Sequence, residues 1–204
     1  MDVITAIKER HSVRKYEKDH KISEETLNEI LEATIEAPSS WNLQHWKFFV
    51  IDDEKQKETL LPIAYNQQQV IDSSLTIAVL GDLEANTNAE RVYGEAVESG
   101  YMNEEVMAAL LSQINGAYEN KQFARDEAVL NSGLAASQLM LAAKAKGYDT
   151  VAMGGFDRAK FVEVFDVSSR YIPVMLIALG KAAEPAHGTR RFPLEDVVVK
   201  NTFK

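Results

Sequence analysis

A run rich in small residues, EAVLNSGLAASQLMLAAKAK at residues 127–146, predicts one long helix at the centre of the fold. Asp126 precedes the run as an N-cap candidate, and Gly147 follows it as a stop signal. The short side chains of Ala135 and Ala136 allow a neighbouring element to pack closely against this helix. A central helix of this kind needs a sheet or other helices around it.

Apolar runs on both sides of this helix predict about four or five strands. Asp2, Ser23 and Asp157 each begin a helical pattern as N-caps, and the pattern after Asp2 places Ile4 and Ile7 inward. The order shows no regular strand–helix–strand alternation, so we expect a layered α+β fold. We expect one domain over residues 1–204, with a polar helical excursion at 82–125 and an extended C-terminal arm at 184–204. The clearest strand patterns are WKFFVID, LTIAVLG, DTVAMGG and YIPVMLIALG.

Charge and composition exclude several classes of protein. The chain carries 22 basic and 31 acidic residues, a formal net charge of −9, which disfavours nonspecific binding to nucleic acid or to an anionic membrane. There is no cysteine, and hence no disulfide or thiolate nucleophile. No signal-peptide pattern and no apolar run long enough to span a membrane is visible. We expect a cytoplasmic protein without nucleic-acid or membrane partners.

Two basic motifs stand near the two ends of this acidic chain. ERHSVRKY at residues 9–16 places two arginines around a serine, and HGTRRFPLEDV at 187–197 contains the pair Arg190 and Arg191. Guanidinium groups bind phosphate oxygens through paired hydrogen bonds, so the two motifs together would form a phosphate clamp. Taken alone, each motif is more simply explained as a solvated charged segment.

The stretch APSSWNLQHW at residues 37–46 contains both tryptophans, separated by polar side chains. Serine, asparagine and glutamine offer neutral donors and acceptors that suit a planar heterocycle such as a flavin pyrimidine. The alternative is a turn at a helix end whose serines satisfy local backbone groups.

A glycine pair follows the strand pattern of DTVAMGG. In AMGGFD, at residues 152–157, glycine allows backbone amides to approach a ligand closely, although a plain turn is the better explanation of the pair taken alone. The four histidines are scattered without metal-ligand spacing, and we expect no metal site.

Taken in order, these motifs resemble the nitroreductase family of FMN-dependent oxidoreductases. The resemblance covers nearly the whole chain except about 82–125, and the ordered set is more specific than any one motif. It rests on IKERHSVRKY, APSSWNLQHW, YNQQQVIDSS, LNSGLAASQLMLAAKAKGYDTVAMGGFD and RRFPLEDVV.

The resemblance implies a nitroreductase-like α+β fold, with a central, mostly antiparallel sheet flanked by helices, in an intertwined homodimer with FMN at the subunit interface. Arg10 and Arg191 would bind the FMN phosphate, Ser12 the ribityl or phosphate region, and Arg14 the pyrimidine edge. His11 stands where the family often has arginine and would contribute its backbone or a weaker contact.

The rest of the implied site surrounds the flavin ring. The loop 38–42 would cover the flavin of the other subunit, Asn66 would reach the ring system, and two glycines would bring backbone amides near N5 and O4. The complete implied set is Arg10, His11, Ser12, Arg14, Pro38, Ser39, Ser40, Asn42, Asn66, Gly154, Gly155, Arg190 and Arg191.

The implied activity is ping-pong hydride transfer through flavin N5, from NADH or NADPH to a nitroaromatic, a quinone or a related electron-poor acceptor, with no catalytic side chain required. The alternatives are dehalogenation, enone reduction or flavin breakdown on the same scaffold, or a flavin-binding carrier or sensor without turnover. His45 departs from the family, which usually has proline there, and Gly154 stands where some members have glutamate. These departures leave the role of His45 and the preferred electron donor open.

Overall fold

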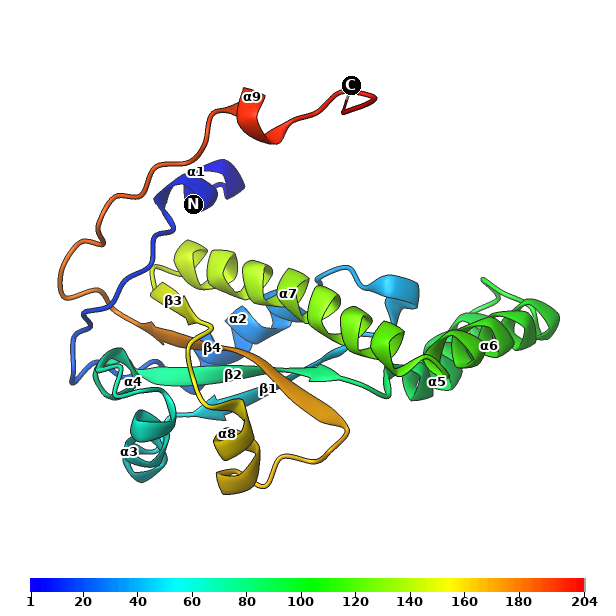
Figure 1. The fold of residues 1–204 in the computed structure, drawn as a ribbon, viewed down its shortest axis with the longest axis horizontal. Helices are drawn as coiled ribbons and strands as arrows, with labels where there is room; N and C mark the ends of the chain where they lie inside the picture. Colours follow the sequence, from blue (N-terminus) through cyan, green and yellow to red (C-terminus); the bar gives the residue numbers. More distant parts are fainter. Residues whose placement is uncertain (204) are drawn as a thin grey trace.

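The computed structural model describes residues 1–203 and contains a four-stranded antiparallel sheet in the order β1-β2-β4-β3 (Figure 1). The strands are β1 (Trp46–Ile51), β2 (Leu75–Asp82), β3 (Asp149–Met153) and β4 (Tyr171–Gly180). Every residue of β2 is buried, as expected for a strand with neighbours on both sides and helices over both faces. The predicted α+β class and antiparallel sheet are confirmed.

Alternate residues of β2 belong to two separate cores, because successive side chains of a strand point to opposite faces. Ile77 packs with the helices α2 (Glu24–Ile35) and α7 (Lys121–Ala145). Ala78 packs on the other face with α3 (Glu54–Ile63) and α8 (Arg158–Val164). Figure 1 shows the sheet between these two helical layers.

The long central helix is present but begins earlier than predicted. Its N-cap is Asn120, whose side chain accepts hydrogen bonds from the backbone amides of Gln122 and Phe123. Asp126 lies inside the helix, where its carboxylate accepts a hydrogen bond from the Gln122 side chain. The prediction of Asp126 as N-cap was wrong because Asn120 caps the helix six residues earlier. Ala135 and Ala136 are buried as expected.

The predicted excursion forms a helical hairpin of α5 (Ala89–Glu98) and α6 (Glu104–Tyr118), preceded by the 3₁₀ helix η2 (Ala85–Asn88). In Figure 1 the hairpin projects beyond the end of the sheet. It has its own apolar cluster, built on Ala89, Tyr93 and Ile114. The remaining short elements between α2 and β2 are η1 (Ser40–Asn42) and α4 (Gln69–Asp72).

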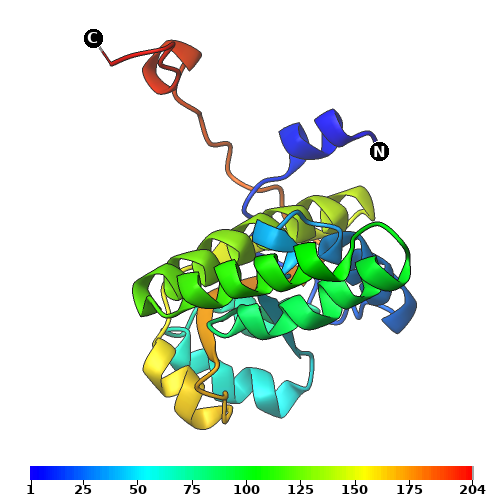
Figure 2. The same cartoon turned by 90° about the vertical axis from the view of Figure 1, so that its right-hand side faces the viewer.

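Both ends of the chain stand away from the body (Figure 2). Helix α1 (Val3–Glu9) is capped by Asp2 as predicted, but Ile4 and Ile7, which the pattern placed inward, are exposed. The C-terminal arm contains a single helical turn, α9 (Leu194–Val197), and is otherwise irregular. Lys204 lies outside the described residues. Among those residues, none of the helices is long and apolar enough to cross a membrane.

Candidate functional site

The basic segment 10–14 lies along the edge of the sheet next to β3. The Val13 amide donates to the Thr150 carbonyl at 3.1 Å, and Ser12 forms a parallel bridge with Thr150. Val13 is buried in the core, which anchors the segment. Arg14 is exposed, and Arg10 is half-buried. The segment therefore presents two guanidinium groups beside β3.

The chain leaves β3 through Gly154 and Gly155, which are both exposed. A β-carbon added at either glycine would meet no atom within 4 Å. The next residue, Phe156, is buried and returns the chain to the core. The structure thus leaves open space at the glycine pair, where the backbone is accessible to a ligand.

The loop that contains Asn66 is fixed to this glycine turn. The Gln67 side-chain amide donates to the carbonyls of Gly155, at 2.8 Å, and Ala64, at 2.9 Å. The backbone at Asn66 has a positive φ of 58°, which asparagine tolerates better than most residues. The sequence analysis did not predict this role of Gln67, although the polar run YNQQQ contains several side chains that could fix a loop by hydrogen bonds. Its hydrogen bond places Asn66 beside the glycine turn.

Four parts of the predicted site therefore lie together around β3. They are the arginines Arg10 and Arg14, Ser12, the loop that contains Asn66, and the glycine turn at Gly154 and Gly155. Arginines suit an anionic group, and amides with open backbone suit a polar ring edge. His11 adds a buried Nδ1 atom with no hydrogen-bond partner in the described part of the chain. Residues 1–203 contain no cluster of side chains that could hold a metal ion.

The loop 38–42 lies elsewhere. The Ser40 amide donates to Oδ1 of Asn131 on α7 at 2.8 Å, and the Asn131 side chain is held in turn by Glu127. The Ser39 hydroxyl accepts a hydrogen bond from the Gln44 amide at 3.0 Å. Figures 1 and 2 both place η1 away from the turn after β3. Within one chain, Pro38, Ser39, Ser40 and Asn42 do not meet Gly154 and Gly155.

The two tryptophans hold the ends of this loop. Trp46 is buried against Ala37 and Ala135, while Trp41 packs with the cluster under α5 and α6 and meets Phe123 edge-on at 6.1 Å. The Trp41 carbonyl also accepts a hydrogen bond from the Tyr93 hydroxyl at 3.1 Å. The tryptophans are therefore structural anchors of the loop.

The C-terminal arm starts beside the basic segment and then leaves it. The Ala183 amide donates to the Lys15 carbonyl at 3.0 Å, and Lys15 pairs with Glu184 at 2.8 Å. Farther along, Arg190 and Arg191 are exposed, and among the described residues the Arg191 guanidinium donates only to Thr189 and Arg190, the two residues before it. Their part in a phosphate clamp stays a prediction.

His45 is fully buried, and neither ring nitrogen has a hydrogen-bond partner among the described residues. Its ring stacks on Tyr118, with 6.4 Å between centroids. Burial lowers the pKa of His45, and the negative charges of Glu127 and Asp82 oppose this shift. The imidazole therefore packs α6 onto the loop as a neutral ring.

This burial predicts that His45→Leu stabilises the protein, because leucine removes two unsatisfied polar atoms; we expect about 1–3 kcal/mol. Because the pKa is lowered in the folded state, the unfolded chain binds the extra proton first as the pH falls below about 6.5. Wild-type stability should therefore fall between pH 7 and 5 relative to His45→Leu. Urea unfolding at both pH values measures the gap, which is the difference in the free energy of unfolding between His45→Leu and the wild type. His187→Leu, at an exposed position, is the control, and a gap that does not widen at pH 5 contradicts the account.

Comparison with known proteins gives the family. The model of the nitroreductase family matches residues 7–181. The chain is 53% identical to YodC of Bacillus subtilis over 196 residues, which is 96% of this chain and 97% of that protein. The chain belongs to the nitroreductase family. YodC itself is provisionally named as an NAD(P)H nitroreductase.

Solved structures of this family agree with the fold. A provisionally named nitroreductase from Exiguobacterium sibiricum, crystallised in complex with FMN, superposes with a TM-score of 0.91 at 42% identity and 98% coverage of both chains. A sequence relative from Lactiplantibacillus plantarum, named as a CLA biosynthesis enone reductase, is 33% identical over 93% of this chain and 90% of its own. The family is thus shared by relatives with different named acceptors.

Proposed function

We propose that this protein is a homodimeric oxidoreductase that uses bound FMN and NAD(P)H to reduce nitroaromatics, quinones or related electron-poor acceptors. The observation that carries the proposal is the grouping of the arginine-bearing segment 10–14, the Asn66 loop and the open glycine turn around β3. Membership of the nitroreductase family supports the cofactor and the electron donor. The cytoplasmic location stays a prediction.

The residues around β3 fit FMN. Arg10 and Ser12 would hold the phosphate and ribityl end, and Arg14 would face the pyrimidine edge. Asn66 would contact the ring system, while the backbone amides of Gly154 and Gly155 would approach N5 and O4. The open space at both glycines supports this placement, because a flat ring can lie directly on the backbone there.

A second copy of the chain would complete the site. Apolar side chains are exposed on α1, on α7 and on the arm, and monomeric soluble proteins rarely leave such patches uncovered. Dimer formation would bury them and bring the loop 38–42 and Arg191 to a flavin. The exposed side chains on these elements include Val3, Ile4, Leu130, Leu134, Phe192 and Leu194.

When bound, FMN would supply the redox chemistry, which is hydride transfer between the nicotinamide and the acceptor. The chain positions the partners and sets the electrostatics. Arg14 would stabilise negative charge on the ring, and the glycine turn would leave its face open to successive substrates. Residues 82–125 would border the acceptor side, within one FMN-binding domain formed by the whole chain.

Enone reduction is the alternative with specific support, because a relative named as an enone reductase shares 33% identity over nearly the full chain. Dehalogenation, flavin breakdown and a carrier without turnover remain alternatives without such support. Stopped-flow reoxidation of the reduced protein by a panel of nitroaromatics, quinones and enones separates these reactions.

The proposed function predicts that the purified protein is yellow, releases FMN on denaturation and has the mass of a dimer. It should oxidise NADH or NADPH in the presence of a quinone or nitroaromatic. A visible spectrum, light scattering and a steady-state assay measure these properties. A colourless protein that takes up no added FMN contradicts the proposal, and a yellow protein without turnover favours the carrier.

A further inference from the structure

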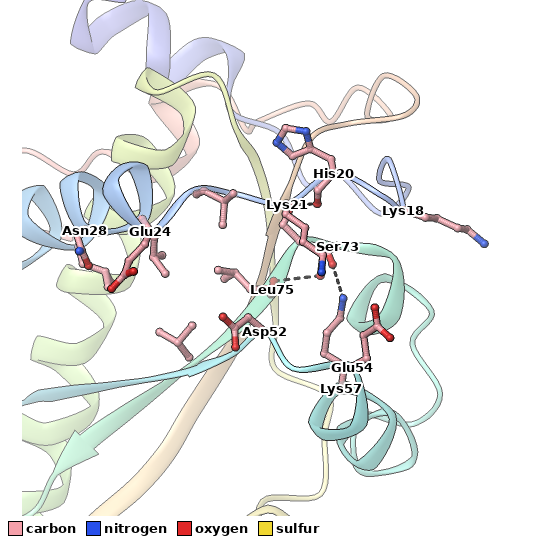
Figure 3. A pocket seen from close by; sticks show the side chains of 15 residues that line it. Lys18, His20, Lys21, Glu24, Asn28, Asp52, Glu54, Lys57, Ser73 and Leu75 are labelled. Carbon is pink, nitrogen blue, oxygen red and sulfur yellow. Dashed lines mark hydrogen bonds between the residues drawn. The ribbon is translucent and has the colours of Figure 1, made fainter.

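A cavity of about 500 Å³ lies between α2, α3 and the segment 18–22, well within the size range of small-molecule pockets (Figure 3). It shares no residue with the site around β3. The ends of β1 and β2 form its floor. The residues that line it are Lys18, His20, Lys21, Ile22, Glu24, Leu27, Asn28, Leu31, Val50, Asp52, Glu54, Lys57, Ser73, Ser74 and Leu75.

Lys57 is the unusual residue of this cavity. It is only 7% exposed, and its ammonium donates to the Ser73 carbonyl at 2.6 Å. No carboxylate of the described residues pairs with it within 4.0 Å. Burial lowers the pKa of Lys57, and the carboxylates Glu54 and Asp72 oppose this shift. A buried ammonium without a direct counterion is costly, and a ligand carboxylate would relieve that cost.

Other unpaired charges of both signs surround the cavity. Lys21, Glu24, Asp52 and Glu54 line the cavity and form no ion pair with any described residue. In Figure 3, Lys21 and Lys57 lie at the Ser73 side, Glu24 lies at the opposite side, and the carboxylate of Asp52 lies between them. A ligand that carries only one kind of charge would meet repulsion here, because lining groups with the same sign as its own charge stand nearby.

An apolar wall runs between these charged groups. Ile22 comes from the segment 18–22, Leu27 and Leu31 come from α2, and Val50 and Leu75 come from the ends of β1 and β2. Such a wall suits a short aliphatic chain, since its burial removes apolar surface from water.

We propose that this cavity binds a free α-amino acid with an aliphatic side chain. The carboxylate would lie against Lys57 and Lys21, the ammonium against Asp52, and the side chain along the apolar wall. A phosphate would face Asp52 and Glu54, and a simple hydrocarbon would leave every one of these charges unpaired. The inference does not depend on FMN binding or on turnover.

Isothermal titration calorimetry of the full chain with its cofactor, using L-leucine as the probe, tests this inference. We expect saturable one-to-one binding, with 4-methylpentanoate and isoamylamine at least tenfold weaker because each keeps the carbon chain of leucine but lacks one charge of the zwitterion. Lys57→Met and Asp52→Asn should each weaken L-leucine binding by about tenfold or more. Asp52 is exposed, so Asp52→Asn tests the site even if the buried Lys57→Met variant folds poorly.

Lys55→Met is the matched control, because Lys55 lies on the same helix, is exposed and does not line the cavity. It should bind L-leucine like the wild type. The inference is overturned if L-leucine does not bind, if Asp52→Asn binds it unchanged, or if 4-methylpentanoate binds as tightly. FMN content measured on the same samples separates this outcome from any failure of the proposed function.

Discussion

Gly155→Val is expected to weaken FMN binding by at least about 100-fold, close to 2.7 kcal/mol, while leaving the fold intact. Nothing lies within 4 Å of a β-carbon built at Gly155, so the chain itself tolerates the larger residue. In the proposed complex the valine side chain would occupy the space of the flavin ring. Fluorescence titration of the apoprotein with FMN measures the affinity, and circular dichroism melting measures the fold.

Gly116→Val is the matched control, because Gly116 lies in α6 and a β-carbon there also meets no atom within 4 Å. It should bind FMN like the wild type. If Gly155→Val binds FMN normally, the flavin does not lie on the glycine turn. A large loss of thermal stability in Gly155→Val would instead show that the turn is part of the core.

Arg14→Ala is expected to lower the reduction potential of bound FMN by about 30–60 mV, because the guanidinium no longer stabilises the negative charge of the reduced ring. Reduction by the nicotinamide should slow roughly 10- to 100-fold. Arg14 is exposed and beside β3, so its removal leaves no buried group unpaired. Spectroelectrochemistry gives the potential, and anaerobic stopped-flow mixing gives the rate.

Lys15→Ala removes the neighbouring charge, which pairs with Glu184 at the base of the arm. That variant should keep the wild-type reduction potential of FMN. The comparison therefore separates a specific contact of Arg14 with the flavin from a general loss of positive charge nearby. An Arg14→Ala protein that holds FMN at an unchanged potential and reduction rate would show that Arg14 does not face the pyrimidine edge.

Much of the fold follows from local patterns. The strands WKFFVID and LTIAVLG and the caps Asp2, Ser23 and Asp157 lie where the pattern predicted them, because burial and capping act over a few residues. Exposed apolar positions on α1 were predicted as inward, since a pattern shows which face is apolar but not what covers it. The start of α7 could not be predicted in the same way, because Asn120 and Asp126 are both suitable N-caps and local propensity does not rank one above the other.

The site was predictable in its parts and less so in its assembly. The motif at 10–14, Asn66 and the glycine pair come together through hydrogen bonds of Val13 and Gln67, two residues without a visible chemical role in the sequence. Asn131, which fixes Ser40, was equally hidden inside a helix pattern. Such supporting residues act through long-range contacts, and a single sequence does not reveal those contacts.

The central claim, a flavin shared between subunits, is tested most directly by the FMN content of a mixed dimer. One protomer carries Gly155→Val and the other carries Ser40→Trp, a bulky residue in the loop 38–42. We expect each homodimer to lose FMN. In the mixed dimer one site combines both changes and the other combines neither, so we predict one FMN per dimer. A mixed dimer without FMN contradicts the account, because it would mean that the loop serves its own subunit.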